Sequence, residues 1–377
     1  MKKNVLFTLI AMLAASSAFA QQSPVTVYGL IDAAFRSGNN YETGVGNAVG
    51  TQTGLNQGAL HGSRLGFKGD EDLGGGTSVV FDVEMGLVIY NGTSDQQGQL
   101  FGRQAYVGLK NKEWGELYAG RQNGLAFDIY KNYDPIGVGN SNEDSWEDTL
   151  WGLRFDNTLK YKNSWGPVKA EVQYTAGGAA GSTTIGTTDA LALTYATGPF
   201  SASVLDQHST DANSKVLNVV GFGSSFVVGP TTLLLDYFTA KRDAGFAKAA
   251  SLSGGSLANT SLMGNAGNTL QRTDSVWTAG LMFKPTPVMV YTVGYMTDNV
   301  TNDSSTGNSG KVSTGYGLVE YYVTKRTEFY GMVDYTKVSG GEIDNGTQTN
   351  TVLQFSDIAL GGNTSRTGFT VGICTKF

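Results

Sequence analysis

The sequence predicts an all-β fold, a 16-stranded antiparallel transmembrane β-barrel whose third external loop folds inward. Three observations support this prediction. First, apolar and polar residues alternate along many short stretches. Second, the connections between these stretches are alternately tight turns and long polar loops. Third, the amino-acid composition favours sheets. With 52 Gly against 7 Pro, and with 18 Tyr and 18 Phe, the chain suits turns and pleated surfaces. Its 377 residues would usually form two domains, but large barrels fold as one.

The alternation defines strands with one apolar and one polar face. Val83, for example, lies between Asp82 and Glu84. Similar patterns occur near residues 25–34, 64–68, 168–174 and 328–335. Successive side chains of a strand point to opposite faces, so these charged residues all lie on one face of their strands. A charged face suits the water-filled interior of a barrel, whereas a soluble β-sandwich needs an apolar face to pack against its second sheet. No short repeat typical of a solenoid is visible.

The connections between these stretches are short and long in turn. Seven tight turns are expected at residues 70–76, 111–115, 163–167, 197–199, 228–230, 284–287 and 324–327. Polar or glycine-rich loops are expected near 37–61, 91–100, 122–149, 176–189, 207–214, 243–272, 298–311 and 338–365. Seven turns and eight loops separate 16 strands, an even number typical of outer-membrane barrels. A barrel of this size holds water.

Residues 1–20 are predicted to form a secretory signal peptide, which leaves residues 21–377 as the barrel. Lys2-Lys3 precedes an apolar run to Leu13, and Ala18-Phe19-Ala20 resembles a cleavage site. An uncleaved anchor is the alternative, but the apolar run is shorter than the roughly 18 residues of a spanning helix.

Charge and residue usage argue against several functions. Without Lys2 and Lys3 the formal charge changes from -6 to -8, which is unfavourable for binding nucleic acid. Cys374 is the only cysteine, so no intramolecular disulfide can form. His61 and His208 are the only histidines, and both are expected in or beside loops. We therefore expect no metal site, no cofactor and no Ser-His-Asp enzyme.

One long loop, residues 120–148, lies between the alternating stretches 116–121 and 154–161 and is too polar to form a core. Loops of this length inside compact proteins are uncommon and usually functional or disordered. We expect this loop to narrow the water-filled barrel.

Several fragments, taken in order, resemble the general porins of Gram-negative bacteria, specifically the trimeric 16-stranded type of neisserial and related outer membranes. They include Val25-Thr26-Val27-Tyr28-Gly29, Ser63-Arg64-Leu65-Gly66-Phe67-Lys68-Gly69, Arg103-Gln104-Ala105-Tyr106-Val107-Gly108-Leu109, Gly120-Arg121-Gln122, Asp134-Pro135 and the terminal Phe377. The family commonly ends with Arg-His before the last aromatic residue, whereas this chain has Cys374-Thr375-Lys376-Phe377.

The resemblance implies a multi-pass protein of the outer membrane, a homotrimer that lets ions and small hydrophilic solutes diffuse passively. Its partners would be those solutes, outer-membrane lipid and the insertion machinery, which would recognise Phe377. The resemblance also implies a constriction, with arginines on the wall facing carboxylates on the third loop. The basic wall would comprise Arg64, Lys68, Arg103 and Arg154, and the acidic side Glu84, Asp128 and Asp134. Arg36, Asp82 and Arg121 are secondary candidates.

Parity supports these candidates unequally. Arg64 and Lys68 share the inward parity of their strand, and so do Asp82 and Glu84. Arg103 and Arg121, however, fall on outward parity, so each needs a bulge or a position at a strand end to reach the lumen. Any one arginine could instead be solvated, or brace the loop through an ion pair. Together they favour anion preference or weak selectivity.

Other functions remain open from the sequence. A substrate-specific channel would share the architecture, whereas a surface adhesin or a barrel enzyme would be a different class. No nucleophile–base motif supports the enzyme.

Overall fold

The computed structural model describes residues 25–42, 49–139, 147–247, 257, 259–264, 267–303, 307–340 and 363–377. The expected signal peptide, residues 1–20, and residues 140–146 of the long loop lie outside this described part. Within it, no helix combines the length and apolar character that a membrane crossing needs.

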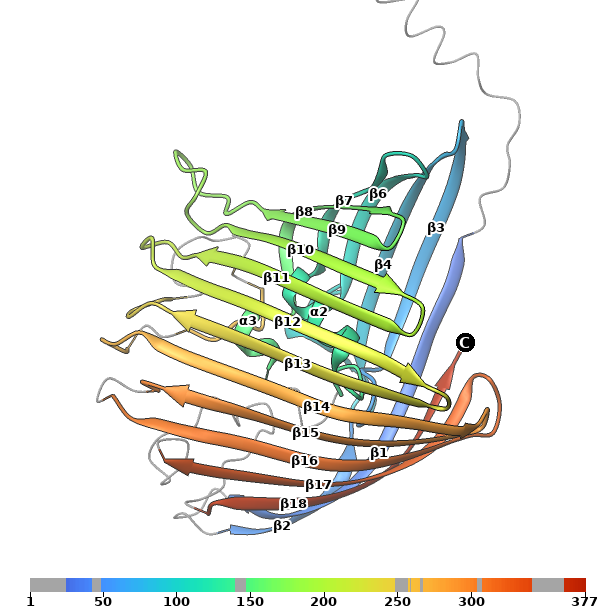
Figure 1. The fold of residues 1–377 in the computed structure, drawn as a ribbon, viewed down its shortest axis with the longest axis vertical. Helices are drawn as coiled ribbons and strands as arrows, with labels where there is room; N and C mark the ends of the chain where they lie inside the picture. The colour runs from blue at the N-terminus through green and yellow to red at the C-terminus, as the bar shows by residue number, and fades with distance from the viewer. Residues whose placement is uncertain are drawn as a thin grey trace, which may run out of the picture.

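The described residues form one large antiparallel sheet (Figure 1). Its strands are β1 (Thr26–Glu42), β2 (Val49–Asn56), β3 (Arg64–Gly74), β4 (Thr77–Val88), β5 (Thr93–Ser94), β6 (Gln104–Asn111), β7 (Gly115–Asn123), β8 (Arg154–Trp165), β9 (Val168–Thr175), β10 (Thr188–Thr197), β11 (Phe200–Thr210), β12 (Val216–Val228), β13 (Thr231–Arg242), β14 (Arg272–Thr286), β15 (Met289–Thr301), β16 (Ser309–Tyr322), β17 (Thr327–Gly340) and β18 (Ser365–Lys376). Three short helices are η1 (Gln96–Gly98), α2 (Leu125–Tyr133) and α3 (Asp148–Trp151).

The sheet closes into a barrel because β1 pairs with β18, with Leu30 opposite Lys376. Two of the strands add no position to the wall. The strands β2 and β3 share one position, since β1 pairs with both, and the two-residue β5 pairs with β4 alone. The predicted 16-stranded barrel is therefore confirmed. Closure pairs the wall strands on both sides, as lipid requires, whereas among the described strands β2 and β5 each pair on one side only.

Connection lengths largely follow the prediction, and Figure 1 shows the short turns gathered on the rim that carries the C-terminus. Several predicted boundaries are wrong because strands continue into the expected connections: β3 runs to Gly74, β8 to Trp165 and β11 to Thr210. Two further cases show the reason. The expected loop 37–61 is partly sheet, because β1 continues to Glu42 and pairs there with β2. The turn expected at 284–287 comes later, because β14 continues to Thr286. Both extensions gain ladder hydrogen bonds that a pattern of apolar residues does not reveal.

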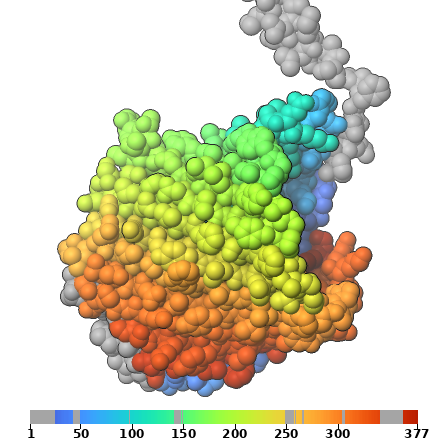
Figure 2. Space-filling view, viewed as in Figure 1, coloured from blue at the N-terminus to red at the C-terminus, as the bar shows by residue number. Residues whose placement is uncertain are grey.

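The wall is apolar outside and polar inside. On β18, Phe369 and Val371 are 61% and 63% exposed on the outer face, whereas Thr370 and Arg366 are buried on the inner face. Figure 2 shows the strands as a continuous outer wall that hides the inner helices. This apolar outer surface suits contact with lipid chains.

Helix α2 lies inside the barrel, and its residues explain its limits. Leu125, Ile129 and Tyr133 recur every four residues and are all buried on one face. The helix ends before Asp134, which is extended because Pro135 follows it. The expectation that the loop is too polar to form a core is wrong, since α2 and α3 join an apolar cluster with β11, β12 and β13.

Candidate functional site

The strands β3, β4, β7 and β8 and helix α2 surround a cavity of about 1180 Å³ inside the barrel. Charged side chains of both signs line it. Among the described residues these are Arg64, Arg103, Arg121, Lys131, Arg154, Lys160 and Lys162, and the acids Asp82, Glu84, Asp95, Asp128 and Glu171. Seven cations face five carboxylates, an excess of two positive charges.

Helix α2 is fixed to the wall at both ends. At its start, the Leu125 backbone N–H donates to Oε1 of Gln173 on β9, at 2.8 Å. At its end, the Tyr133 hydroxyl lies 2.7 Å from the Ser203 hydroxyl on β11. Tyr133 packs against Gly223 so closely that a Cβ there would overlap its ring. Glycine in the wall therefore makes room for the inner helix.

Aromatic side chains hold the rest of the inner segment. The Trp151 ring of α3 lies 4.9 Å from Tyr130 of α2 and 5.0 Å from Phe238 of β13, centroid to centroid. All three are fully buried. Aromatic pairs at this distance stabilise beyond their buried area, so the cluster keeps the helices against one side of the barrel and leaves the cavity on the other.

The predicted wall residues Arg64, Arg103 and Glu84 form one cluster. Arg103 Nε lies 2.6 Å from Glu84 Oε1, whereas Arg64 is more distant, at 3.9 Å from the same oxygen. The Tyr28 hydroxyl lies between two carboxylates, 2.7 Å from Asp82 Oδ1 and 3.0 Å from Glu84 Oε2, so its single proton can be donated to either. One carboxylate thus serves two guanidinium groups, and the cluster keeps a net positive charge.

Arg103 and Arg121 reach the cavity in the two ways that outward parity requires. Arg103 immediately precedes β6, where its backbone N–H still donates to the carbonyl of Glu84. Arg121 lies where the register of β7 against β8 shifts between Gly120 and Gln122. The shift turns the Arg121 side chain inward, where it lies 2.7 Å from Asp156.

Asp128 of α2 faces the cavity and pairs with the wall. Its Oδ2 lies 2.8 Å from Lys160 Nζ on β8, and its Oδ1 accepts from the Asn123 amide at 3.0 Å. Removal from bulk water raises the pKa of the Asp128 carboxyl, but the charge and hydrogen bond of Lys160, together with Asn123 and Lys131, outweigh this, and the pKa lies below its ordinary value. Asp128 is therefore ionised at neutral pH and braces the helix.

Lys131, which was not predicted from the sequence, is exposed by α2 to the same cavity. Within the described part of the chain it has no carboxylate within ion-pair distance. Removal from bulk water lowers the pKa of the Lys131 ammonium, and the wall arginines lower it further, although Asp128 opposes them. The inner loop thus brings a cation as well as an anion to the lumen. Strand parity could not have found it, because the residue is on a helix.

Three predicted residues lie outside the cavity lining. The Asp134 carboxylate accepts the backbone N–H groups of Ile136 and Val138, at 3.2 and 2.6 Å, and so shapes the loop after α2. Lys68 Nζ lies 4.8 Å from the centre of the Tyr28 ring, a cation–π contact. Arg36 forms a buried ion pair, 2.7 Å from Asp334.

Arg154 also lines the cavity, from the first position of β8, and is mostly buried. Charges on opposite sides of such a space produce a field across it. At physiological salt this field acts over about 8 Å, so an ion that passes α2 experiences both the wall and the helix.

A family model described as Gram-negative porin matches residues 8–341 of the sequence. The chain belongs to the Gram-negative porin family. The family resemblance predicted from the sequence is therefore confirmed, as is the prediction of a multi-pass outer-membrane protein.

Curated relatives match over shorter stretches. An outer membrane porin protein of Bordetella pertussis is 36% identical over 173 residues, which are 43% of this chain and 44% of the relative. The major outer membrane protein P.IB of Neisseria meningitidis serogroup B is 38% identical over 128 residues, 34% of this chain and 36% of the relative. These matches span less than half the length of either relative.

Solved structures share the fold along most of the chain. An anion-selective porin from Comamonas acidovorans has a TM-score of 0.72 and 21% identity, covering 94% of this chain and 100% of that one. The trimer form of OmpT from Vibrio cholerae has a TM-score of 0.60 and 13% identity, covering 94% and 99%. At this identity, the similarity establishes the barrel fold.

Proposed function

We propose that the chain forms a water-filled channel through which ions and small hydrophilic solutes diffuse passively across the outer membrane. The observation that carries this proposal is the charged cavity between α2 and the wall, inside a closed barrel with an apolar outer face. A channel of this kind needs no catalytic group, and we propose that the protein is not an enzyme.

We also propose that the passage beside α2 is the constriction and that it prefers small anions. Arg64, Arg154 and Lys131 approach it from the wall and from the helix. Glu84 and Asp128 are already engaged by cations, at 2.6 and 2.8 Å. A passing anion would therefore meet more attraction than a passing cation. The solved porin from Comamonas acidovorans, described as anion-selective, supports this direction.

Assembly as a homotrimer is a proposal supported by the trimer form of OmpT. Cleavage after residue 20, which leaves residues 21–377 as the barrel, and recognition of Phe377 by the insertion machinery remain predictions from the sequence.

Single-channel recording in a planar lipid bilayer tests the proposed function. We expect stepwise conductance increments that scale with the salt concentration. Purified protein without such steps would exclude the channel. Block by one particular solute at low concentration would instead identify a substrate-specific channel.

A further inference from the structure

The barrel seam brings together side chains that are far apart in the sequence. Glu328 on β17 lies directly opposite Cys374 on β18, and Cys374 lies opposite Asp32 on β1. All three side chains are on the inner face, and each is at most 1% exposed. The register therefore places a carboxylate on either side of the only cysteine in the chain.

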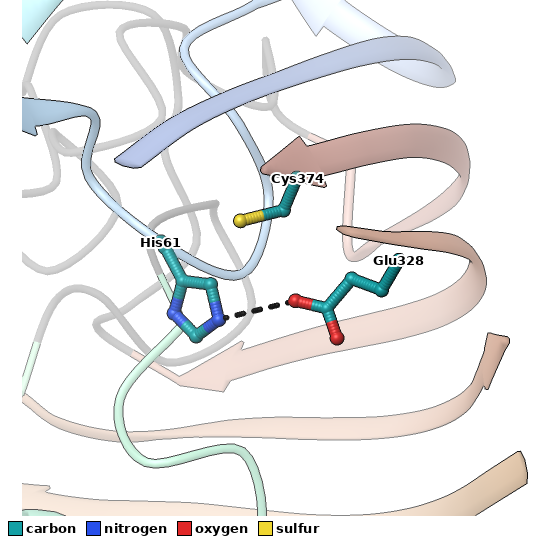
Figure 3. A group of neighbouring side chains, drawn as sticks. All are labelled: His61, Glu328 and Cys374. Carbon is teal, nitrogen blue, oxygen red and sulfur yellow. Dashed lines mark ion pairs between the residues drawn. The ribbon is translucent and has the colours of Figure 1, made fainter. Parts of the chain in front are cut away.

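His61 completes this group from the segment between β2 and β3. Figure 3 shows its imidazole directed toward Glu328 and Cys374. His61 Nε2 lies 3.6 Å from Glu328 Oε1, and the potential donor atoms of His61, Glu328 and Cys374 all lie within 4.8 Å of one another. We call these three residues the seam cluster.

The backbone of His61 is held in place independently of its ring. Its N–H donates to Asp32 Oδ2 at 2.8 Å, and the Tyr330 hydroxyl donates to Asp32 Oδ1 at 2.6 Å. Asp32 is therefore occupied with positioning His61. The imidazole itself remains about one third exposed and lines the cavity, so a small ion can approach it from the lumen.

Glu328 is the observation that points to a ligand. Its side chain is buried, yet within the described part of the chain neither carboxylate oxygen has a hydrogen-bond partner. Its nearest basic groups are the His61 imidazole, at 3.6 Å, and the ammonium of Lys376, at 3.8 Å on a side chain that is 43% exposed. The Tyr322 hydroxyl also lies beside Glu328, but it donates to Glu320 at 2.7 Å. A buried carboxylate is unfavourable unless it is paired or binds a metal.

We propose that the seam cluster binds a divalent transition-metal ion of the Zn²⁺ class, through His61 Nε2, a Glu328 oxygen and Cys374 Sγ. Imidazole, carboxylate and thiolate are the usual ligands of Zn²⁺, with bonds of roughly 2.0–2.3 Å. Donors at that distance around a tetrahedral ion lie roughly 3.3–3.8 Å apart, so those of the seam cluster, now within 4.8 Å of one another, must approach by up to about 1.5 Å. Binding releases the thiol proton to water and displaces the Lys376 ammonium, and lumenal water takes the fourth position.

Cobalt(II) tests this site because a thiolate–cobalt bond absorbs in the near ultraviolet and Zn²⁺ complexes do not. The chain has one cysteine, so any such band in the full-length, reduced protein reports Cys374. We expect a saturable band at one Co²⁺ per chain, which equimolar Zn²⁺ abolishes. No band, or a band that Zn²⁺ leaves unchanged, would overturn the proposal.

Substitutions then identify the ligands. Cys374→Ser should abolish the band, and His61→Gln and Glu328→Gln should each weaken Co²⁺ affinity by more than about tenfold. His208→Gln is the matched control, because His208 is exposed and lies beside Asp206, at 3.7 Å. We expect it to bind Co²⁺ like the unaltered protein. If His61→Gln and Glu328→Gln bound Co²⁺ as tightly as the control His208→Gln, the thiol alone would bind the ion, and the proposed site would be wrong.

Discussion

Lys160 Nζ on the barrel wall lies 2.8 Å from the Asp128 carboxylate on the inner helix α2. Lys160 also donates to the backbone carbonyl of Asn123, at 2.9 Å, just before the helix begins. One wall side chain thus joins two points of the segment that narrows the lumen. Its contribution concerns the position of the helix more than the stability of the barrel.

We expect Lys160→Met to loosen α2 without unfolding the protein. A partly exposed ion pair is worth about 0–1 kcal/mol, so the thermal midpoint should change little, whereas noise in the open-channel current should increase. Lys162→Met is the control, since Lys162 pairs with Glu116 at 3.0 Å on the neighbouring strand and not with the helix. Equal noise in both variants would refute the bracing role.

Acidification should release the same contact only at low pH. The pKa of Asp128 lies below its ordinary value, so the ion pair persists above that pKa and is lost as the pH falls through it. At about pH 4, the ordinary range for aspartate, the noise of the unaltered channel should still equal its neutral value. Asp128→Asn should show the increased noise already at neutral pH. A transition above pH 4 that Asp128→Asn removes would contradict this assignment.

Trp151→Ala should free the inner segment and widen the passage. Trp151 is fully buried between Tyr130 and Phe238. Truncating such a side chain typically costs about 3–5 kcal/mol, and here the loss weakens the packing of α2 and α3 against the wall. We therefore expect a larger conductance and a weaker near-ultraviolet circular dichroism signal. Trp165→Ala is the control, because Trp165 is 55% exposed at a short turn. Unchanged conductance in Trp151→Ala would refute the role of the cluster.

Arg36→Gln should destabilise the barrel and leave ion selectivity unchanged. Arg36 and Asp334 are buried and share two hydrogen bonds of 2.7 and 2.8 Å. Removing one partner of a buried pair costs about 3–5 kcal/mol, which urea unfolding would measure. The double variant Arg36→Met with Asp334→Leu should be less destabilised than Arg36→Gln, because no buried charge is left unpaired. A change in reversal potential in Arg36→Gln would place Arg36 in the ion path after all.

Strand parity explains how much of the site the sequence could predict. Arg64 and Glu84 were placed on the inner face by alternation alone, and both line the cavity. The direction of Arg121 depends on a register shift against β8, which forms only when the strands pair. Parity therefore suggested that a bulge was needed but not where it lies.

Residues off the strands were harder to assign. Lys131 could not be placed because the loop contains a helix packed on distant strands, and the packing decides which face meets the lumen. Asp134 precedes a proline, a signal for a turn in which the carboxylate binds nearby backbone N–H groups. The structure shows such contacts. The seam cluster joins residues 61, 328 and 374 only through barrel closure, which no local pattern encodes.

In the proposed channel, ions pass between α2 and the wall, and Lys131 favours anions there. The direct test is the reversal potential across a planar bilayer under a potassium chloride gradient. Removing a charge 4–8 Å from the path changes an ion's energy by about 0.5–1 kcal/mol in water, in opposite directions for chloride and potassium. Lys131→Gln should therefore lower the chloride-to-potassium permeability ratio about five- to thirtyfold. Lys284→Gln is the control, because Lys284 is exposed near the end of β14 and does not line the cavity. It should leave the permeability ratio unchanged. An unaltered channel that prefers potassium, or a Lys131→Gln channel with the original ratio, would contradict the account.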